Sequence, residues 1–199
     1  MNQEIIEHLK LADPVINQLI NRIGKCTLIP RRNEPFDVLV SSIISQQLSE
    51  KAATSIKNRL IKSRNLERPF NPKQFCNLEV EALRKCGLSN SKSEFIIALA
   101  NLVINGDLNF SELEKYDNDL VIEELLKIRG VGIWTAEMFL IFCLGRLDVF
   151  ALRDAGLKRA ISDLYGSRYK NNATELLHLA EKWRPYRSVA SWYFWRYLD

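Results

Sequence analysis

Apolar residues recur at three- and four-residue spacing along most of this 199-residue chain, and strict alternation of apolar and polar residues is scarce. The first pattern is typical of amphipathic helices, whereas alternation would indicate strands. Glycine and proline divide the pattern at intervals of about one helix, for example at Pro30, Pro35, Gly87, Gly106 and Gly145. The sequence therefore predicts an all-α fold.

Local start signals place the expected helices. Asp13 followed by Pro14 is typical of an N-cap with proline at the first helical position, so a helix is expected from there through Ile23. Further helices are expected at about 37–45, 49–63, 79–85, 92–105, 117–128, 133–144, 154–165, 174–183 and 185–197. The segment 133–144 is apolar on nearly every side, which indicates a buried central helix.

Composition restricts the class of protein. With 47% hydrophobic residues the chain can bury a substantial core, and its formal net charge of +4 is compatible with a polyanionic partner without requiring one. The cysteines at 26, 76, 86 and 143 are far apart, which favours buried thiols in an intracellular protein over a zinc site or a disulfide framework. The N-terminus does not resemble a secretion signal, and the longest apolar run, 138–144, is too short to span a bilayer.

A glycine pair separates two apolar helical segments near the middle of the chain. Gly130, Val131 and Gly132 allow a tight turn whose backbone can approach a ligand closely. A new helix would then begin at about Ile133, and the unpaired amides at a helix N-terminus favour a phosphate oxygen. We therefore expect a DNA-backbone contact at Gly130, Val131, Gly132 and Thr135. The alternative is a helix C-cap and an ordinary two-helix corner, which is sufficient to explain a GxG pair on its own.

A lone carboxylate stands directly before a predicted helix. Asp154 precedes the segment 155–161, and aspartate is a preferred N-cap residue, so a purely structural role would explain it. A catalytic role is compatible with the cap, because a reaction that develops positive charge needs a fixed negative group facing it. The residue pattern leaves both roles open.

These segments together resemble the helix-hairpin-helix DNA glycosylase superfamily, in particular its 3-methyladenine DNA glycosylase II (AlkA-type) branch. Residues 126–136 resemble the hairpin, and the stretch 148–157 is similar to the D-V-F-P-x-x-D-x-G-L motif that holds the catalytic aspartate, here Asp154. Residues 36–53 and 183–195 are similar to the N-terminal and C-terminal signatures. Ala151 departs from the motif, since many members carry proline there.

The resemblance implies an architecture and a set of site residues. Two helical lobes are expected, one from about 1–48 plus 129–199 and one from about 49–128, with the active-site cleft between them. Asp154 would be catalytic, and Lys158 and Arg187 would add salt-dependent DNA affinity. The base pocket would contain Trp134, Met138 and Trp195; the DNA wedge would contain Gln46 and Gln47; and the carbonyls of Ile128 and Gly130 would hold a Na⁺ or K⁺ ion. From the residues alone, most C-terminal aromatics also fit an ordinary core, and 45–49 also fits a capped helix junction.

The function implied by the resemblance is hydrolytic excision of alkylated purines, of the 3-methyladenine or 7-methylguanine type, in base excision repair. Glycosylases that also nick the strand carry a lysine two residues after the second hairpin glycine, where this chain has Trp134, so a monofunctional enzyme is expected. The cysteine spacing does not fit the iron-sulfur loop of some relatives, so no cofactor is expected. Damaged double-stranded DNA would be the partner of a monomer in the cytoplasm and nucleoid, or the nucleus of a eukaryote. Two alternatives remain: a glycosylase for uracil, mismatched thymine or an oxidised purine, and a non-catalytic DNA-binding module.

Overall fold

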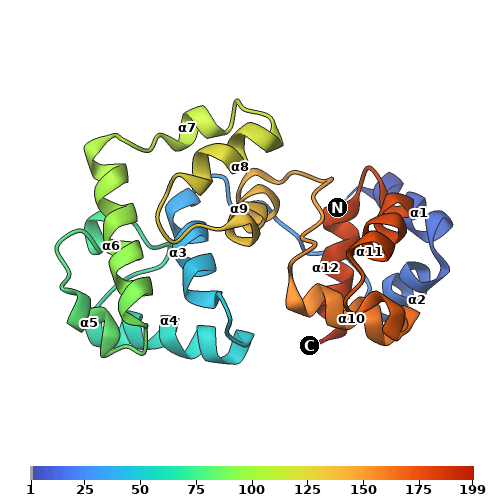
Figure 1. The fold of residues 1–199 in the computed structure, drawn as a ribbon, viewed down its shortest axis with the longest axis horizontal. Helices are drawn as coiled ribbons and strands as arrows, with labels where there is room; N and C mark the ends of the chain where they lie inside the picture. Colours follow the sequence, from blue (N-terminus) through green and yellow to red (C-terminus); the bar gives the residue numbers. More distant parts are fainter. Residues whose placement is uncertain (1) are drawn as a thin grey trace. The chain divides into compact units, whose positions relative to one another are not determined.

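The computed structural model describes residues 2–199, and within these residues it contains helices and no strand, which confirms the all-α prediction. The chain divides into two compact units (Figure 1). One comprises the N-terminal segment up to Pro30 together with Gly145–Asp199, and the other is Arg31–Leu144. No helix among the described residues has both the length and the apolar character needed to cross a membrane.

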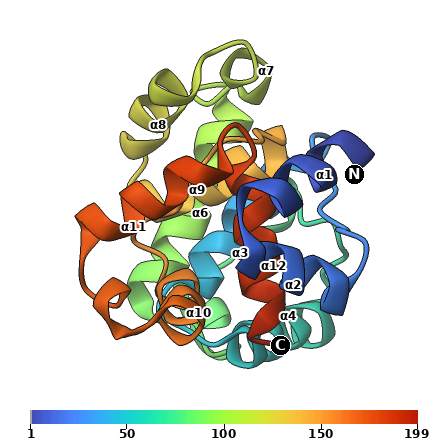
Figure 2. The ribbon, with the colours of Figure 1, turned by 90° about the vertical axis from the view of Figure 1, so that its right-hand side faces the viewer.

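The unit formed by the two ends of the chain is built around α12 (Figures 1 and 2). Its helices are α1 (Gln3–Ala12), α2 (Pro14–Ile23), α10 (Ala155–Tyr165), α11 (Ala173–Ala180) and α12 (Arg187–Tyr197), with short 3₁₀ turns η3 (Ser167–Tyr169) and η4 (Glu181–Trp183). The predicted cap is present, because Asp13 Oδ1 accepts the Val15 N–H at 2.9 Å. Its Oδ2 accepts the Tyr165 hydroxyl at 2.9 Å and the Trp183 indole N–H at 3.0 Å, so one buried carboxylate joins α2, α10 and η4.

The unit Arg31–Leu144 is built around α3 (Pro35–Ser45), in which every residue from Phe36 to Ile44 is buried. The other elements are α4 (Glu50–Arg64), η1 (Pro72–Gln74), α5 (Val80–Arg84), α6 (Asn90–Asn105), α7 (Phe110–Leu113), α8 (Asn118–Leu126), α9 (Ile133–Phe139) and the π-helical η2 (Leu140–Leu144). The central helix expected at 133–144 is therefore present, and its last turn is π-helical. The sequence prediction does not include α1 or the short α7.

The division of the chain differs from the expected lobes. Segments 31–48 and 129–144 were expected with the two termini, but the structure groups them with the middle of the chain. The reason is packing, because α3 contacts α4, α6 and α9, and α9 also contacts α8. Leu39 and Ile43 on α3 and Phe139 on α9 are all buried, as expected where these helices pack together.

Candidate active site

Asp154 is the N-cap of α10, as the residue pattern predicted. One carboxylate oxygen, Oδ1, accepts two hydrogen bonds: from the Leu157 backbone N–H at 2.6 Å and from the Trp195 indole N–H at 3.0 Å. The first donor belongs to α10 itself and the second to α12. The Asp154 side chain is partly buried. The two donors, which come from two helices, fix the direction of its carboxylate.

Trp195 was expected to stack on the excised base, and the structure adds a second relation. Its indole N–H is directed at Asp154, so the ring edge, and not only the ring face, belongs to the site. Gly156 lies next to this hydrogen bond. A Cβ at position 156 would lie 3.3 Å from Asp154 Oδ1, which is tighter than an ordinary contact, and 3.7 Å from Trp195 Cδ1, which is ordinary contact, so a side chain there would press on the carboxylate. The structure therefore brings Asp154, Gly156 and Trp195 together within one unit.

The connector that leads to Asp154 is held by the start of α12. Arg187 donates from Nε to Asp148 Oδ1 at 2.6 Å and from Nη2 to Asp148 Oδ2 at 3.1 Å. The Ser188 hydroxyl donates to the Arg146 carbonyl at 2.7 Å and accepts the Val149 N–H at 3.0 Å. Arg187 was expected to attract DNA, but its side chain is only 13% exposed and is paired with Asp148. Its role in this structure is to anchor the connector.

The glycines of the hairpin have different structural requirements. Gly130 has φ +89, and a Cβ there would lie 2.2 Å from the Phe95 ring on α6, so both its backbone conformation and its packing require glycine. Gly132 is exposed, with φ −104, and a Cβ there would meet no atom within 4 Å. Since the protein itself does not require glycine at 132, the position is open to close approach by a ligand.

The loop after α3 separates the two predicted wedge residues. Gln47 is exposed and has a left-handed backbone, with φ +57. Gln46 instead donates its side-chain N–H groups to the Gly130 carbonyl at 2.9 Å and to Thr135 Oγ1 at 2.8 Å. The wedge role proposed for Gln46 does not fit this engagement. Thr135 was expected among the DNA-backbone contacts, which stays a prediction. Its side chain is 1% exposed and accepts the Gln46 N–H, so it braces the hairpin from inside.

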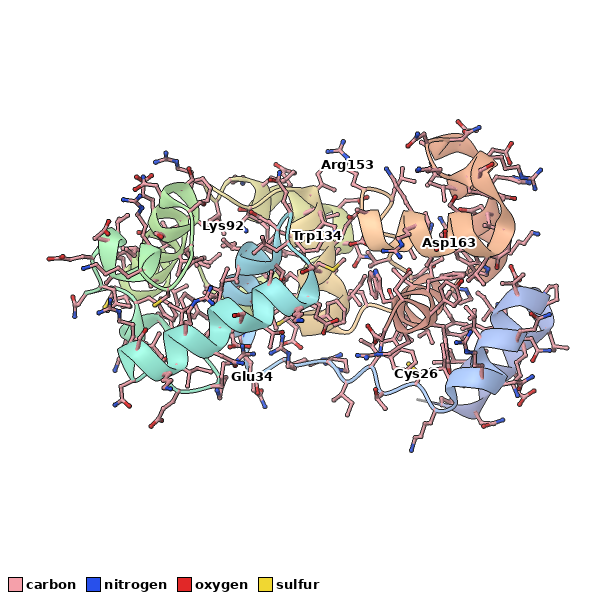
Figure 3. The ribbon with its side chains drawn as sticks, turned by 90° about the horizontal axis from the view of Figure 1, so that it is seen from below. Cys26, Glu34, Lys92, Trp134, Arg153 and Asp163 are labelled. Atoms are coloured by element: carbon pink, nitrogen blue, oxygen red, sulfur yellow. The ribbon has the colours of Figure 1, made fainter. Side chains whose placement is uncertain are left out.

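The helix after the hairpin carries the other predicted pocket residues. Trp134 on α9, marked in Figure 3, is partly exposed, whereas Met138 one turn later is 5% exposed. The Ala136 N–H donates to the Gly132 carbonyl at 3.0 Å, so α9 begins directly after the hairpin. Trp134 and Met138 belong to the unit Arg31–Leu144 and Trp195 to the other, so their common base pocket stays a prediction.

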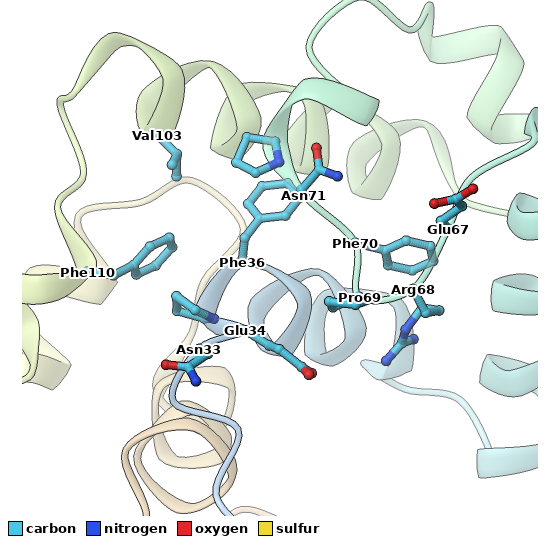
Figure 4. A pocket seen from close by; sticks show the side chains of 12 residues that line it. Asn33, Glu34, Phe36, Glu67, Arg68, Pro69, Phe70, Asn71, Val103 and Phe110 are labelled. Atoms are coloured by element: carbon cyan, nitrogen blue, oxygen red, sulfur yellow. The ribbon is translucent and has the colours of Figure 1, made fainter.

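A cavity of about 460 Å³ lies at the N-terminal end of α3, the opposite end from Gln46 (Figure 4). It contains none of the predicted site residues. Its lining is largely apolar, with Phe36, Phe70, Phe110 and Val103, and Arg68 at its edge is paired with the buried Asp37 at 2.7 Å. Sequence reasoning did not indicate this cavity, and its chemistry does not connect it with Asp154 or the hairpin.

Known proteins resemble this chain over nearly all of its length. Residues 40–185 match the family model described as HhH-GPD superfamily base excision DNA repair protein. The chain is 37% identical to alkylbase DNA glycosidase-like protein mag2 of Schizosaccharomyces pombe, over 96% of this chain and 91% of that protein. It is 31% identical to DNA-3-methyladenine glycosylase 1 of the same yeast, over 95% and 84%.

Solved structures give the same result. The S. pombe 3-methyladenine DNA glycosylase Mag1, in complex with abasic DNA, matches with a TM-score of 0.85 and 31% identity, over 98% of this chain and 96% of that one. A Bacillus halodurans DNA-3-methyladenine glycosidase matches with a TM-score of 0.75 and 38% identity, over 98% and 89%. The fold of these structures is the helical fold described above.

Proposed function

Because the chain belongs to the HhH-GPD superfamily of base excision DNA repair proteins, we propose that it is a monofunctional DNA glycosylase that releases alkylated purines from double-stranded DNA. The observation that carries this proposal is the position of Asp154, a carboxylate fixed at a helix N-terminus by the Leu157 and Trp195 N–H groups. The names of the relatives, several of them 3-methyladenine DNA glycosylases, support the substrate class. Such an enzyme would act as a monomer inside the cell.

The reaction needs little more from the protein than one carboxylate. A purine alkylated at N3 or N7 already carries positive charge, so it leaves without a dedicated acid when its N-glycosidic bond breaks. Asp154 would stabilise the oxocarbenium-like sugar and direct the water that attacks it, which is the electrostatic part of glycoside hydrolysis. Position 134 is tryptophan and not lysine, which supports hydrolysis without a covalent lyase step.

The unit Arg31–Leu144 would bind and distort the duplex. The open backbone at Gly132 and the first amides of α9 would hold a phosphate. Gln47 would fill the space left by the extruded base, because extrusion costs a few kcal/mol of stacking and pairing that the enzyme must offset. Trp134 and Trp195 would receive the extruded base, with stacking worth about 1–3 kcal/mol.

A monovalent cation at the hairpin belongs to this proposal. The Ile128 carbonyl accepts the Val131 N–H at 3.0 Å, and the Gly130 carbonyl accepts Gln46 Nε2 at 2.9 Å. A carbonyl oxygen has two lone pairs, so each keeps one that a Na⁺ or K⁺ ion can use. The residues present are therefore compatible with the ion, which would add positive charge beside the phosphate.

The direct test is base release from methylated duplex DNA, with duplexes that contain uracil, mismatched thymine or an oxidised purine in parallel. We expect release of 3-methyladenine and 7-methylguanine, and apurinic strands that remain intact until they are treated with base. If the protein released only uracil, mismatched thymine or an oxidised purine, that base would be its substrate in place of alkylated purines. Binding without release from any duplex would instead identify a DNA-binding module.

The hydrogen bond between Trp195 and Asp154 predicts a separable effect on catalysis. Trp195→Phe keeps an aromatic ring for the base but removes the indole N–H. Hydrogen bonds to charged groups contribute about 1.5–3 kcal/mol, so base release at saturating enzyme should slow by about 10- to 100-fold. The binding of undamaged duplex should not change. If Trp195→Phe were as active as wild type, the hydrogen bond to Asp154 would make no contribution to base release, and only the aromatic ring of Trp195 would matter.

A further inference from the structure

A lysine on α6 donates hydrogen bonds to the C-terminal end of α3, where the loop that carries Gln47 begins. Lys92, labelled in Figure 3, lies on α6. It donates from Nζ to the Ile44 carbonyl at 2.9 Å and to the Gln46 carbonyl at 2.7 Å. The last carbonyls of a helix have no partner within it, and the chain turns away at Gln47, which has φ +57. Lys92 therefore satisfies two acceptors directly before the exposed Gln47, and a cation suits the negative end of α3.

The position of Lys92 in its own helix is unfavourable, which indicates a use elsewhere. It lies in the first turn of α6, after the N-cap Ser89, and this first turn contains no acidic residue. A positive side chain at a helix N-terminus opposes the helix dipole. Burial also lowers the pKa of Lys92, because removing the ammonium from water disfavours its charged form. A lysine that served only solubility would remain in water.

The same part of α6 also supports the hairpin. Phe95, one turn after Lys92, packs against Gly130. The Arg129 guanidinium lies 5.4 Å from the centroid of the Phe95 ring, and Arg129 pairs with Glu94 at 3.6 Å. Gln46 then joins the loop directly to the Gly130 carbonyl. One end of α6 therefore contacts both the loop that carries Gln47 and the hairpin.

We infer that Lys92 is a positioning residue for base extrusion, which holds the backbone that leads into Gln47 so that this side chain enters the duplex at a fixed distance from the hairpin. The inference rests on the proposed function. A wedge on a mobile loop would lose part of its effect, because each insertion would first have to order the loop. Lys92 does this ordering before DNA binds.

The experiment compares full-length wild type, Lys92→Met and Lys92→Arg on two duplexes. In one, the alkylated purine faces its normal partner; in the other, it faces an abasic spacer and needs little help to leave the stack. Lys85→Met is the matched control, because Lys85 is an exposed lysine in the same unit and its loss changes net charge equally. A second readout is the fluorescence of 2-aminopurine at the target position, which rises on unstacking and requires no chemistry.

We expect Lys92→Met to slow release from the paired duplex by about tenfold, with a smaller rise in 2-aminopurine fluorescence, and to slow release from the spacer duplex by less than about twofold. Lys92→Arg, which keeps the charge and several donors, should recover most of the loss. Equal losses on both duplexes, or a Lys92→Met protein that matches Lys85→Met, would overturn the inference. If wild type released no alkylated base, the proposed function would fail, and the fluorescence comparison would still decide the role of Lys92.

Discussion

Replacing Asp154 with asparagine is expected to remove nearly all base release while duplex binding stays intact. Asparagine has the same shape and keeps an oxygen that can accept the Leu157 and Trp195 N–H groups, so the local geometry should survive. What it removes is the negative charge that faces the developing positive charge on the sugar. Losing one preorganised electrostatic group costs a rate factor of about 10²–10³, and we expect a loss of at least this size. Single-turnover release and duplex affinity, measured on the same preparations, test this.

The matched control for this prediction is Asp163→Asn. Asp163 lies on the same helix, α10, and is exposed, with Arg159 at 3.9 Å as its ion-pair partner. The substitution removes the same charge from the same helix and should leave release unchanged. Asparagine is as good an N-cap as aspartate, so the thermal stability of Asp154→Asn should also stay close to that of wild type. An Asp154→Asn protein with full activity would reduce Asp154 to a helix cap.

Local sequence signals predicted the parts of the site that depend on neighbours in the chain. Asp13 and Asp154 were both expected as N-caps, and both have this role, because capping is decided within three residues. The corner at Gly130 was expected for the same kind of reason. The catalytic use of Asp154, in contrast, rests on the resemblance, since a cap alone explains the local pattern.

Contacts between distant residues could not be predicted in this way. Gln46 and Gly130 are 84 positions apart, and no periodicity indicates that a glutamine amide reaches a hairpin carbonyl. The pairing of Arg187 with Asp148 is another such contact. Because of it, Arg187 holds the connector before Asp154, although it was expected to bind DNA. Lys92 did leave a signal, since a lysine in the first turn of a helix is in the wrong place electrostatically. Such a mismatch indicates that a residue is used elsewhere, but not where.

The boundary between the two units also depends on contacts between distant residues, so the sequence pattern did not predict it. The segment of α9 and η2 is apolar in the sequence, which predicts that it is buried. Periodicity does not say which neighbour covers an apolar helix. Here α3 is covered by α4, α6 and α9, so the segment 31–48 belongs with the middle of the chain.

Gly130→Ala should cause the largest loss of stability among the substitutions considered. Alanine at this position would have to adopt φ +89, and its Cβ would lie 2.2 Å from Cδ2, 2.3 Å from Cγ and 2.7 Å from Cβ of Phe95. Because Cβ is among these atoms, rotating the ring does not relieve the overlap, and α6 or the hairpin must move. The left-handed conformation and the overpacking together should cost roughly 2–4 kcal/mol, which corresponds to a lower Tm by about 5–15 °C.

Gly132→Ala separates this structural requirement from DNA binding. Position 132 has an ordinary negative φ and no atom within 4 Å of the new Cβ, so its Tm should stay within a degree or two of wild type. If the backbone of Gly132 touches a phosphate, however, a methyl group there would keep the DNA away and weaken duplex binding by about tenfold. Thermal unfolding and a salt titration of binding, run on both variants, distinguish the two glycines. A Gly132→Ala protein that bound DNA as well as wild type would show that the hairpin backbone does not approach the duplex, and the phosphate contact would have to come from another part of the chain.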